Sequence, residues 1–255
     1  MRINLADIQI ERSLLENNMA AVAEKLRQYG VLVVPGMWDS ETTTQLGREF
    51  ESMLNSTAAY IRKVDYSNGR AVTVRMDGIE ADVFPATSGL FRMAMFDRFT
   101  KLYLGREDVH ANDSVYLVND VVGTKHQAND LHFDIQRSLK FFVYLTDTTV
   151  KNGAFACVPG SHKIANEMRL RLGRKLNYDN RELSRQLPVK EEDAIALEGT
   201  AGSLIIFDTE VFHRAGVVTA GERRVMRGQS NFVDALNYPG EQGGGKSFLK
   251  KLFGK

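Results

Sequence analysis

The chain carries, at residues 202–208, the strongly apolar run Gly202-Ser203-Leu204-Ile205-Ile206-Phe207-Asp208. Its β-branched and aromatic residues after a glycine predict a buried strand. Similar short runs lie on both sides of it, separated by turn pairs such as Asn152-Gly153, and they span residues 115–118, 139–145, 154–158, 194–197, 214–218 and 224–232. Many short strands at this spacing predict a β-sandwich or a barrel.

The first 113 residues have a different and mostly helical pattern. Apolar residues at helical spacing predict helices at residues 9–29, 40–54 and 91–103, with a short buried strand at 31–34. Residues 163–187, rich in Arg, Lys, Leu and Glu, indicate a helical insertion between strands. We therefore expect a β-dominated α+β protein. It forms a single domain over residues 1–255, with a helical N-terminal layer (1–113), a β core (114–232) and a C-terminal tail (233–255).

Composition excludes several classes of protein. Hydrophobic residues make up 43% of the 255 residues, which is enough for a packed core and excludes a disordered or fibrous chain. The net charge of +1 gives no overall bias toward nucleic acid, and a single cysteine cannot form an internal disulfide. No apolar run approaches the roughly 20 residues that span a bilayer. The N-terminus lacks the apolar segment of a signal peptide, so we expect a cytoplasmic location.

Two histidines and a carboxylate form a candidate metal site. In a strand, the side chains of His132 and Asp134 point to the same face, so they can bind one ion. His213 follows the apolar run as a third candidate ligand. A lone histidine in a core is more often hydrogen-bonded than metal-bound, so the prediction depends on the combination. Two histidines and one carboxylate leave half of the metal open, as in the facial triad of non-haem Fe(II) oxygenases.

The open positions of such a metal accept a bidentate 2-oxo acid and O2, and the far carboxylate of that acid needs a fixed cation. Arg224 lies eleven residues after His213. Period 2 places Arg224 on one strand face with Met226, Gly228 and Ser230, two of which are small enough to leave room for a ligand. Arg223 falls on the opposite face with Val225, Arg227 and Gln229. The planar guanidinium of an arginine matches a carboxylate and stays charged when partly buried.

The sequence resembles the phytanoyl-CoA dioxygenase family of Fe(II)/2-oxoglutarate oxygenases. The motifs that carry the resemblance are Leu131-His132-Phe133-Asp134, Leu139-Lys140-Phe141-Phe142-Val143-Tyr144-Leu145-Thr146-Asp147, Asn152-Gly153-Ala154-Phe155, Val158-Pro159-Gly160-Ser161-His162-Lys163 and Gly202 to Asp208 with His213 and Arg224. They cover roughly residues 114–232, whereas residues 57–110 carry no recognisable family motif. The resemblance implies a double-stranded β-helix (a cupin-like jelly roll), with Fe(II), 2-oxoglutarate as cosubstrate and O2.

The resemblance also implies roles for individual residues. The iron ligands would be His132, Asp134 and His213, and Arg224 would bind the C5 carboxylate of 2-oxoglutarate. Some family members have a serine where this chain has Ala215, so a second contact to the cosubstrate must come from elsewhere. Further expected contacts are Asn119, Phe142 and Lys140 to the cosubstrate, with Tyr144 as a contact to cosubstrate or substrate and His126 to the substrate.

The expected activity is hydroxylation of a C–H bond in a small molecule, with release of succinate and CO2. A carboxylate at Asp134 favours hydroxylation over halogenation, because it fills the metal position that chloride would take. Demethylation, desaturation or ring closure by the same iron chemistry stay open. So do a metal-free jelly-roll binding protein and a cupin-type dioxygenase that does not use 2-oxoglutarate. Substrate identity and oligomeric state are not readable from the sequence.

The last ten residues form a short basic segment with apolar residues at one-turn spacing. We expect either a packed or frayed tail, or a contact with an anionic membrane surface or an acidic partner. No nucleic-acid partner is expected.

Overall fold

The apolar run forms an inner strand of a large sheet. A computed structural model describes residues 3–66, 68–125, 127–134, 136–166 and 189–233, and in it the run is β8 (Leu204–Asp208). This strand pairs antiparallel with β1 (Val31–Val34) and β5 (Leu139–Tyr144). Leu204 and Ile206 belong to one hydrophobic cluster, and Ile205 and Phe207 to another. The run is apolar throughout because alternate side chains enter cores on opposite faces of the sheet.

Two antiparallel sheets make up the β structure. The seven-stranded sheet has the order β1-β8-β5-β10-β4-β3-β2, and the three-stranded sheet has the order β7-β6-β9. The remaining strands are β2 (Ile61–Tyr66), β3 (Gly69–Arg75), β4 (Ser114–Val121), β6 (Ala156–Val158), β7 (Ile195–Ala196), β9 (Phe212–Arg214) and β10 (Glu222–Gln229). Side chains of both sheets share one core, which includes Phe155, Cys157 and Leu197 beside Phe207 and Val225. This arrangement is the predicted β-dominated jelly roll.

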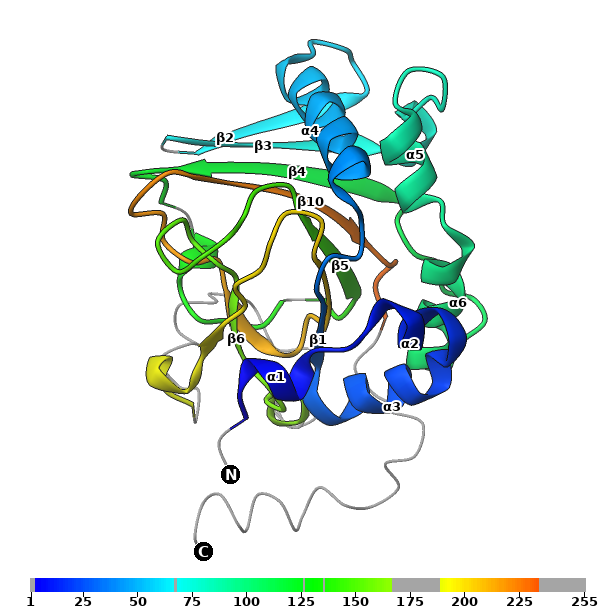
Figure 1. Ribbon diagram of the computed structural model, residues 1–255, viewed down its shortest axis with the longest axis vertical. Coiled ribbons are helices and arrows are strands. Elements are labelled where there is room, and N and C mark those ends of the chain that lie inside the picture. Colours follow the sequence, from blue (N-terminus) through cyan, green and yellow to red (C-terminus); the bar gives the residue numbers. More distant parts are fainter. Residues whose placement is uncertain (1–2, 67, 126, 135, 167–188, 234–255) are drawn as a thin grey trace, which may run out of the picture.

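Helices gather on the other face of the large sheet (Figure 1). They are α2 (Arg12–Asn17), α3 (Met19–Tyr29), α4 (Ser40–Asn55), α5 (Pro85–Phe91) and α6 (Ala94–Leu104), with a short 3-10 turn at Met76–Gly78. The first helix, α1 (Leu5–Ile8), instead places Ile8 in the core between the sheets, and two more 3-10 turns lie at Gln127–Asn129 and Glu191–Asp193. Apolar residues of α3, α4 and α6 pack on Phe141 and Met226 of the sheet. The predicted helices at 40–54 and 91–103 correspond to α4 and α6, whereas the single helix predicted at 9–29 is two helices, α2 and α3, that are separated at Asn18.

The N-terminal layer also supplies three strands of the large sheet. Besides β1, residues 57–110 contain β2 and β3, and β3 pairs with β4 from Arg70 to Arg75. Sequence analysis missed this hairpin because charged residues interrupt its apolar positions, and only Val72 and Val74 of β3 enter the core.

Two expected segments lie outside the described residues. They are residues 167–187 of the predicted helical insertion and residues 234–255 of the tail. Within the described part of the chain, none of the helices combines the length and the apolar character that crossing a membrane requires.

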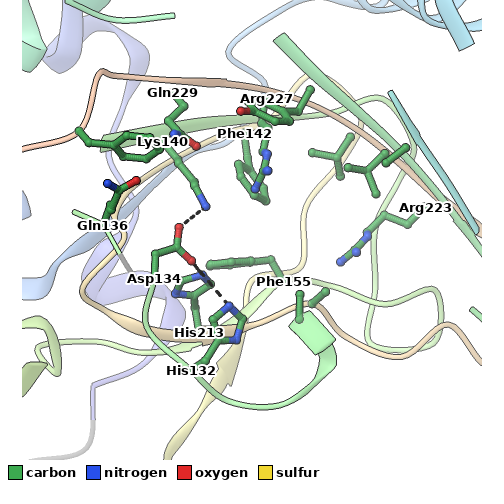
Figure 2. A pocket seen from close by; sticks show the side chains of 17 residues that line it. His132, Asp134, Gln136, Lys140, Phe142, Phe155, His213, Arg223, Arg227 and Gln229 are labelled. Atoms are coloured by element: carbon green, nitrogen blue, oxygen red, sulfur yellow. Dashed lines mark hydrogen bonds and ion pairs between the residues drawn. The ribbon is translucent and has the colours of Figure 1, made fainter. Parts of the chain in front are cut away.

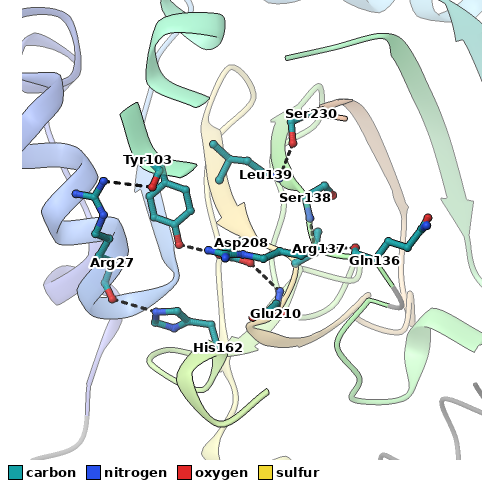
Figure 3. A network of polar contacts seen from close by, with 11 residues as sticks. Arg27, Tyr103, Gln136, Arg137, Ser138, Leu139, His162, Asp208, Glu210 and Ser230 are labelled. Carbon is teal, nitrogen blue, oxygen red and sulfur yellow. Dashed lines mark hydrogen bonds and ion pairs between the residues drawn. The ribbon is translucent and has the colours of Figure 1, made fainter. Parts of the chain in front are cut away.

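The connection from α3 to β1 requires a glycine. Gly30 ends α3 in the left-handed conformation, with φ of 73°. A Cβ at this position would lie 2.5 Å from Nδ1 of His162. That imidazole is buried, and its Nε2 donates a hydrogen bond to the carbonyl of Arg27 at 3.0 Å. His162 therefore joins the helical layer to the turn after β6 (Figure 3).

A buried ion pair at the end of β8 is hydrogen-bonded to Tyr103 of α6 in the same layer. Nε and Nη2 of Arg137 donate to Oδ2 of Asp208 at 3.0 and 2.8 Å, and the hydroxyl of Tyr103 donates to the same oxygen at 2.8 Å (Figure 3). The side chains of the pair are only 4% and 1% exposed. Burial would raise the pKa of Asp208, but the Arg137 guanidinium outweighs burial and holds it below its usual value. Asp208 is therefore charged, and its carboxylate has a structural role in the fold.

Replacing Asp208 with asparagine is expected to lower the free energy of unfolding by ~3–5 kcal/mol, because Arg137 would lose the carboxylate that balances its buried charge. Chemical denaturation measures this change. Asp77→Asn is the matched control, since Asp77 pairs with Arg75 on the surface, and it should leave stability unchanged within error. Equal losses in the two variants would contradict this account of the buried pair.

Candidate active site

Backbone hydrogen bonds bring His132, Asp134 and His213 together. His213 lies in β9, and His132 forms an isolated antiparallel bridge with it. The amide of His132 donates to the carbonyl of His213 at 2.9 Å, and the reverse bond is 2.7 Å. The amide of Asp134 donates to the carbonyl of Thr209 at 2.9 Å, in the turn between β8 and β9. The three predicted ligands thus come from two segments held edge to edge.

Their ligand atoms converge on one point. Oδ1 of Asp134 lies 3.7 Å from Nε2 of His132 and 3.5 Å from Nε2 of His213, and the three ligand atoms lie within 4.8 Å of one another. The Nδ1 atoms of the two histidines lie 2.7 Å from the carbonyls of Asp130 and Val211. Since a carbonyl only accepts, each Nδ1 carries the hydrogen and each Nε2 keeps its lone pair for a metal. Two such nitrogens and one carboxylate oxygen fit a ferrous ion.

The charge states of these groups also suit a metal. Burial would raise the pKa of Asp134, but Lys140 and His213 outweigh burial and hold it well below its usual value. Burial lowers the pKa of His132 to about 4, with a further contribution from His213, so the imidazole is neutral at neutral pH. Metal binding requires a charged carboxylate and neutral imidazoles.

Lys140 forms an ion pair with Oδ2 of Asp134, the oxygen that is not directed at the histidines (Figure 2). Its side chain is 6% exposed. Burial lowers the pKa of Lys140 to about 8, and Asp134 partly offsets this effect. The lysine therefore holds the carboxylate in place and leaves Oδ1 for an ion.

The triad lines a cavity of about 630 Å³ between the two sheets. The inner face of the large sheet forms the opposite wall, and β10 contributes Arg223, Val225, Arg227 and Gln229 to it (Figure 2). Phe142 and Lys140 of β5 also line the cavity, as their predicted roles near the cosubstrate require.

The predicted role of Arg224 needs a correction. Its guanidinium lies on the other face of the sheet, where it pairs with Glu51 of α4 at 2.7 Å and with Glu222 at 2.9 Å. Asn119 is its direct partner in β4 and shares that face, so it does not line the cavity either. The face of β10 that enters the cavity is the one that begins at Arg223.

The small residues beside Arg224 explain the wrong assignment of the face. Gly228 is small because the helical layer lies against it, since a Cβ there would come within 2.9 Å of the Phe91 ring and would overlap the Asn112 side chain. The hydroxyl of Ser230 accepts a hydrogen bond from the amide of Leu139 at 3.0 Å. Met226 packs in the core under the helices. The space on this face is filled by protein and not by a ligand.

Arg223 is the functional candidate that sequence analysis passed over. Its guanidinium pairs with Asp120 and donates to the carbonyl of Gly153, and the two side chains of the pair are 5% and 2% exposed. Its buried Nε has no hydrogen-bond partner among the described residues. Asp120 lies directly opposite Arg223 in β4, a register that the sequence alone does not reveal. The available signal was the apolar side chain of Met226, because it shares a strand face with Arg224 and packs that face of β10 against the helices.

The remaining predicted contacts have different outcomes. The hydroxyl of Tyr144 donates to the carbonyl of Leu197 at 2.9 Å and accepts from the amide of Phe155 at 3.1 Å, and Tyr144 does not line the cavity. Its predicted contact with cosubstrate or substrate is therefore replaced by a structural role. His126 lies outside the described residues.

Comparisons with known proteins agree with this geometry. The family model for phytanoyl-CoA dioxygenase matches residues 26–226, whereas comparison with curated protein sequences finds no match. Similar solved structures include the non-heme alpha ketoglutarate dependent carbocyclase SnoK from nogalamycin biosynthesis (18% identity over 93% of this chain and 92% of that chain, TM-score 0.62).

Two further structures share the fold. One is the epimerase SnoN in complex with Fe3+, alpha ketoglutarate and nogalamycin RO (15% identity, 89% and 92% coverage, TM-score 0.58). The other is EctD from S. alaskensis with bound Fe (18% identity, 84% and 78% coverage, TM-score 0.56). Such low identities establish the fold alone. The family model spans most of the chain, and the converging His132, Asp134 and His213 lie within it, so the chain belongs to the phytanoyl-CoA dioxygenase family of 2-oxoglutarate-dependent non-haem iron oxygenases.

Proposed function

We propose that this oxygenase hydroxylates a C–H bond of a small-molecule substrate and converts 2-oxoglutarate and O2 to succinate and CO2. The observation that carries the proposal is the triad on one wall of a cavity whose opposite wall holds buried cations. An Fe(II) ion held by His132, Asp134 and His213 would supply the activation of O2. The ligands would occupy one side of the ion and leave its other side facing the cavity.

We assign the far carboxylate of 2-oxoglutarate to Arg223. Figure 2 shows Arg223 across the cavity from the triad, as a cosubstrate that bridges the metal and a cation requires. Asp120 and the Gly153 carbonyl hold two of its nitrogens, and its Nε remains as a buried donor without a partner in the described part of the chain. A carboxylate acceptor would satisfy that donor, which is costly to leave unpaired.

Aromatic side chains shield the metal side of the cavity. The ring of Phe155 stacks on that of His213 with centroids 5.5 Å apart, and Phe207 meets the same imidazole at 5.1 Å. These rings fix the orientation of the imidazole and keep water from its inner side. Excluding water protects a C–H oxidation from side reactions.

Ring closure, desaturation and demethylation use the same iron chemistry and differ in the fate of the substrate. A carbocyclase and an epimerase share this fold, so the fold itself does not restrict the outcome to hydroxylation. Product analysis by mass spectrometry separates them, because hydroxylation adds one oxygen atom, whereas desaturation and ring closure remove two hydrogens.

Asp134→Ala is expected to weaken Fe(II) binding by at least about a hundredfold. Mutating a residue that only supports a metal ligand already lowers the affinity by up to about that factor, and loss of the ligand itself should cost more. Anaerobic calorimetry measures the affinity, and the visible charge-transfer absorption of the Fe(II)–2-oxoglutarate complex should disappear. His110→Ala is the control, since His110 is exposed and lies outside the triad. Unchanged Fe(II) affinity in folded Asp134→Ala protein would rule out the triad as the metal site.

Arg223→Lys is expected to weaken 2-oxoglutarate binding on the order of tenfold, because lysine keeps the charge beside Asp120 but loses the planar fork. The matched variant Arg224→Lys changes the neighbouring arginine on the opposite face and should leave the affinity unaltered. Titration of the charge-transfer absorption with 2-oxoglutarate measures both. The reverse outcome, with the loss confined to Arg224→Lys, would restore Arg224 as the cosubstrate ligand.

A further inference from the structure

The lining of the cavity includes a third cation besides Lys140 and Arg223. Arg227 lies four residues after Arg223 on the same face of β10 and lines the cavity. It stands opposite Tyr116 of β4 and Phe142 of β5 in the strand registers, so it occupies the middle of the wall. Figure 2 shows its guanidinium directed into the cavity beside Phe142.

Two aromatic rings orient this guanidinium. Its central carbon lies 4.4 Å from the ring centroid of Tyr116 and 5.8 Å from that of Phe142. Aromatic faces attract a cation and fix the plane of its guanidinium. A planar fork held in this way presents its N–H groups at a fixed angle, which is the geometry that recognises a carboxylate or a phosphate.

The charges of the cavity favour an anion. Among the described residues that line it, Lys140, Arg223 and Arg227 are cations and Asp134 is the only carboxylate. Lys140 pairs with Asp134, and Arg223 pairs with the buried Asp120 behind it. Fe(II) and the 2-oxoglutarate dianion would add equal and opposite charges. The described part of the lining therefore holds more cations than carboxylates, and cations on low-dielectric walls attract anionic ligands.

Neighbouring amides extend the polar part of the wall. Gln229 lies next to Arg227 on the same strand face, opposite Lys140 of β5, and Gln136, three residues before β5, also lines the cavity (Figure 2). By contrast, the cavity lining around Val118, Val225 and Ala71 is apolar. One part of the cavity thus suits a charged group and the other suits a hydrocarbon or ring body.

We propose that Arg227 binds an anionic group of the substrate, a carboxylate or a phosphate, so that the enzyme acts on anionic small molecules. The assignment rests on the proposed function, in which 2-oxoglutarate occupies Arg223. Binding the anion at the middle of the wall would hold the rest of the substrate over the open side of the triad.

Calorimetry on the anaerobic protein loaded with Fe(II) and saturating 2-oxoglutarate tests this proposal. The ligands are benzoate, phenyl phosphate and the neutral isostere benzamide. Wild-type protein should bind at least one of the two anions on the order of tenfold or more tightly than benzamide, since a charged hydrogen-bonded contact contributes at least that factor. The comparison of benzoate with phenyl phosphate distinguishes a carboxylate site from a phosphate site.

Four variants assign the preference to a residue. Arg227→Met and Arg227→Gln remove the charge in two different ways and should bind the anions no better than benzamide. Arg227→Lys keeps the charge without the fork and should retain part of the preference. Arg224→Met is the matched control on the opposite face and should retain all of it. Thermal unfolding establishes which variants are folded, and any one folded neutral variant of Arg227 is sufficient for the comparison.

Three results would overturn the proposal. They are equal binding of the anions and benzamide by wild-type protein, a full anion preference in a folded neutral variant of Arg227, and a loss of 2-oxoglutarate affinity confined to the Arg227 variants, which would make Arg227 the cosubstrate ligand. Failure of the proposed function is distinguishable from all three. It would appear as wild-type protein without charge-transfer absorption, and the anion preference would still be measured on that protein.

Discussion

The pair of backbone hydrogen bonds between His132 and His213 is the constraint on which the site depends. These residues are about eighty positions apart in the sequence, and the bridge fixes their separation and relative orientation. Each imidazole then donates from Nδ1 to a carbonyl two residues away in its own segment. The third ligand, Asp134, is tied by its amide to the turn that leads to His213. The donor set is therefore positioned by the backbone before any ion binds, which limits the reorganisation that binding requires.

The two faces of the large sheet have different roles. Its outer face packs against the helices, and its inner face lines the cavity. Because side chains alternate, the adjacent residues Arg223 and Arg224 enter different environments. Arg224 reaches a helix carboxylate at a half-exposed edge, whereas Arg223 is buried against Asp120. A shift of one position thus separates an arginine that lines the cavity from one in an ion pair on the helical face, although both residues are the same amino acid.

The predictable features are those that local sequence determines. The apolar run at 204–207 predicted a strand, and strand alternation predicted that His132 and Asp134 share one side, although an isolated bridge at His132 and not a strand holds this segment. The face of β10 was not predictable in this way, since it depends on what packs against Gly228, and Asn112 and Phe91 come from distant segments. Asp120 likewise becomes part of the site only through the register of β4 with β10. Long-range pairing therefore supplied the part of the site that local patterns did not indicate.

Aromatic contacts connect the metal site to the rest of the cavity wall. Phe142 meets Phe155 edge-on at 5.4 Å, and Phe155 stacks on the imidazole of His213. Phe142 also lies under the guanidinium of Arg227. These rings form a continuous path from a metal ligand to the cation on the opposite sheet. Close-packed aromatic rings have few alternative rotamers, so the distance between the metal and Arg227 is set by the core between the sheets. A substrate held at Arg227 would therefore meet the metal at a defined distance, which is what selective oxidation of one C–H bond requires.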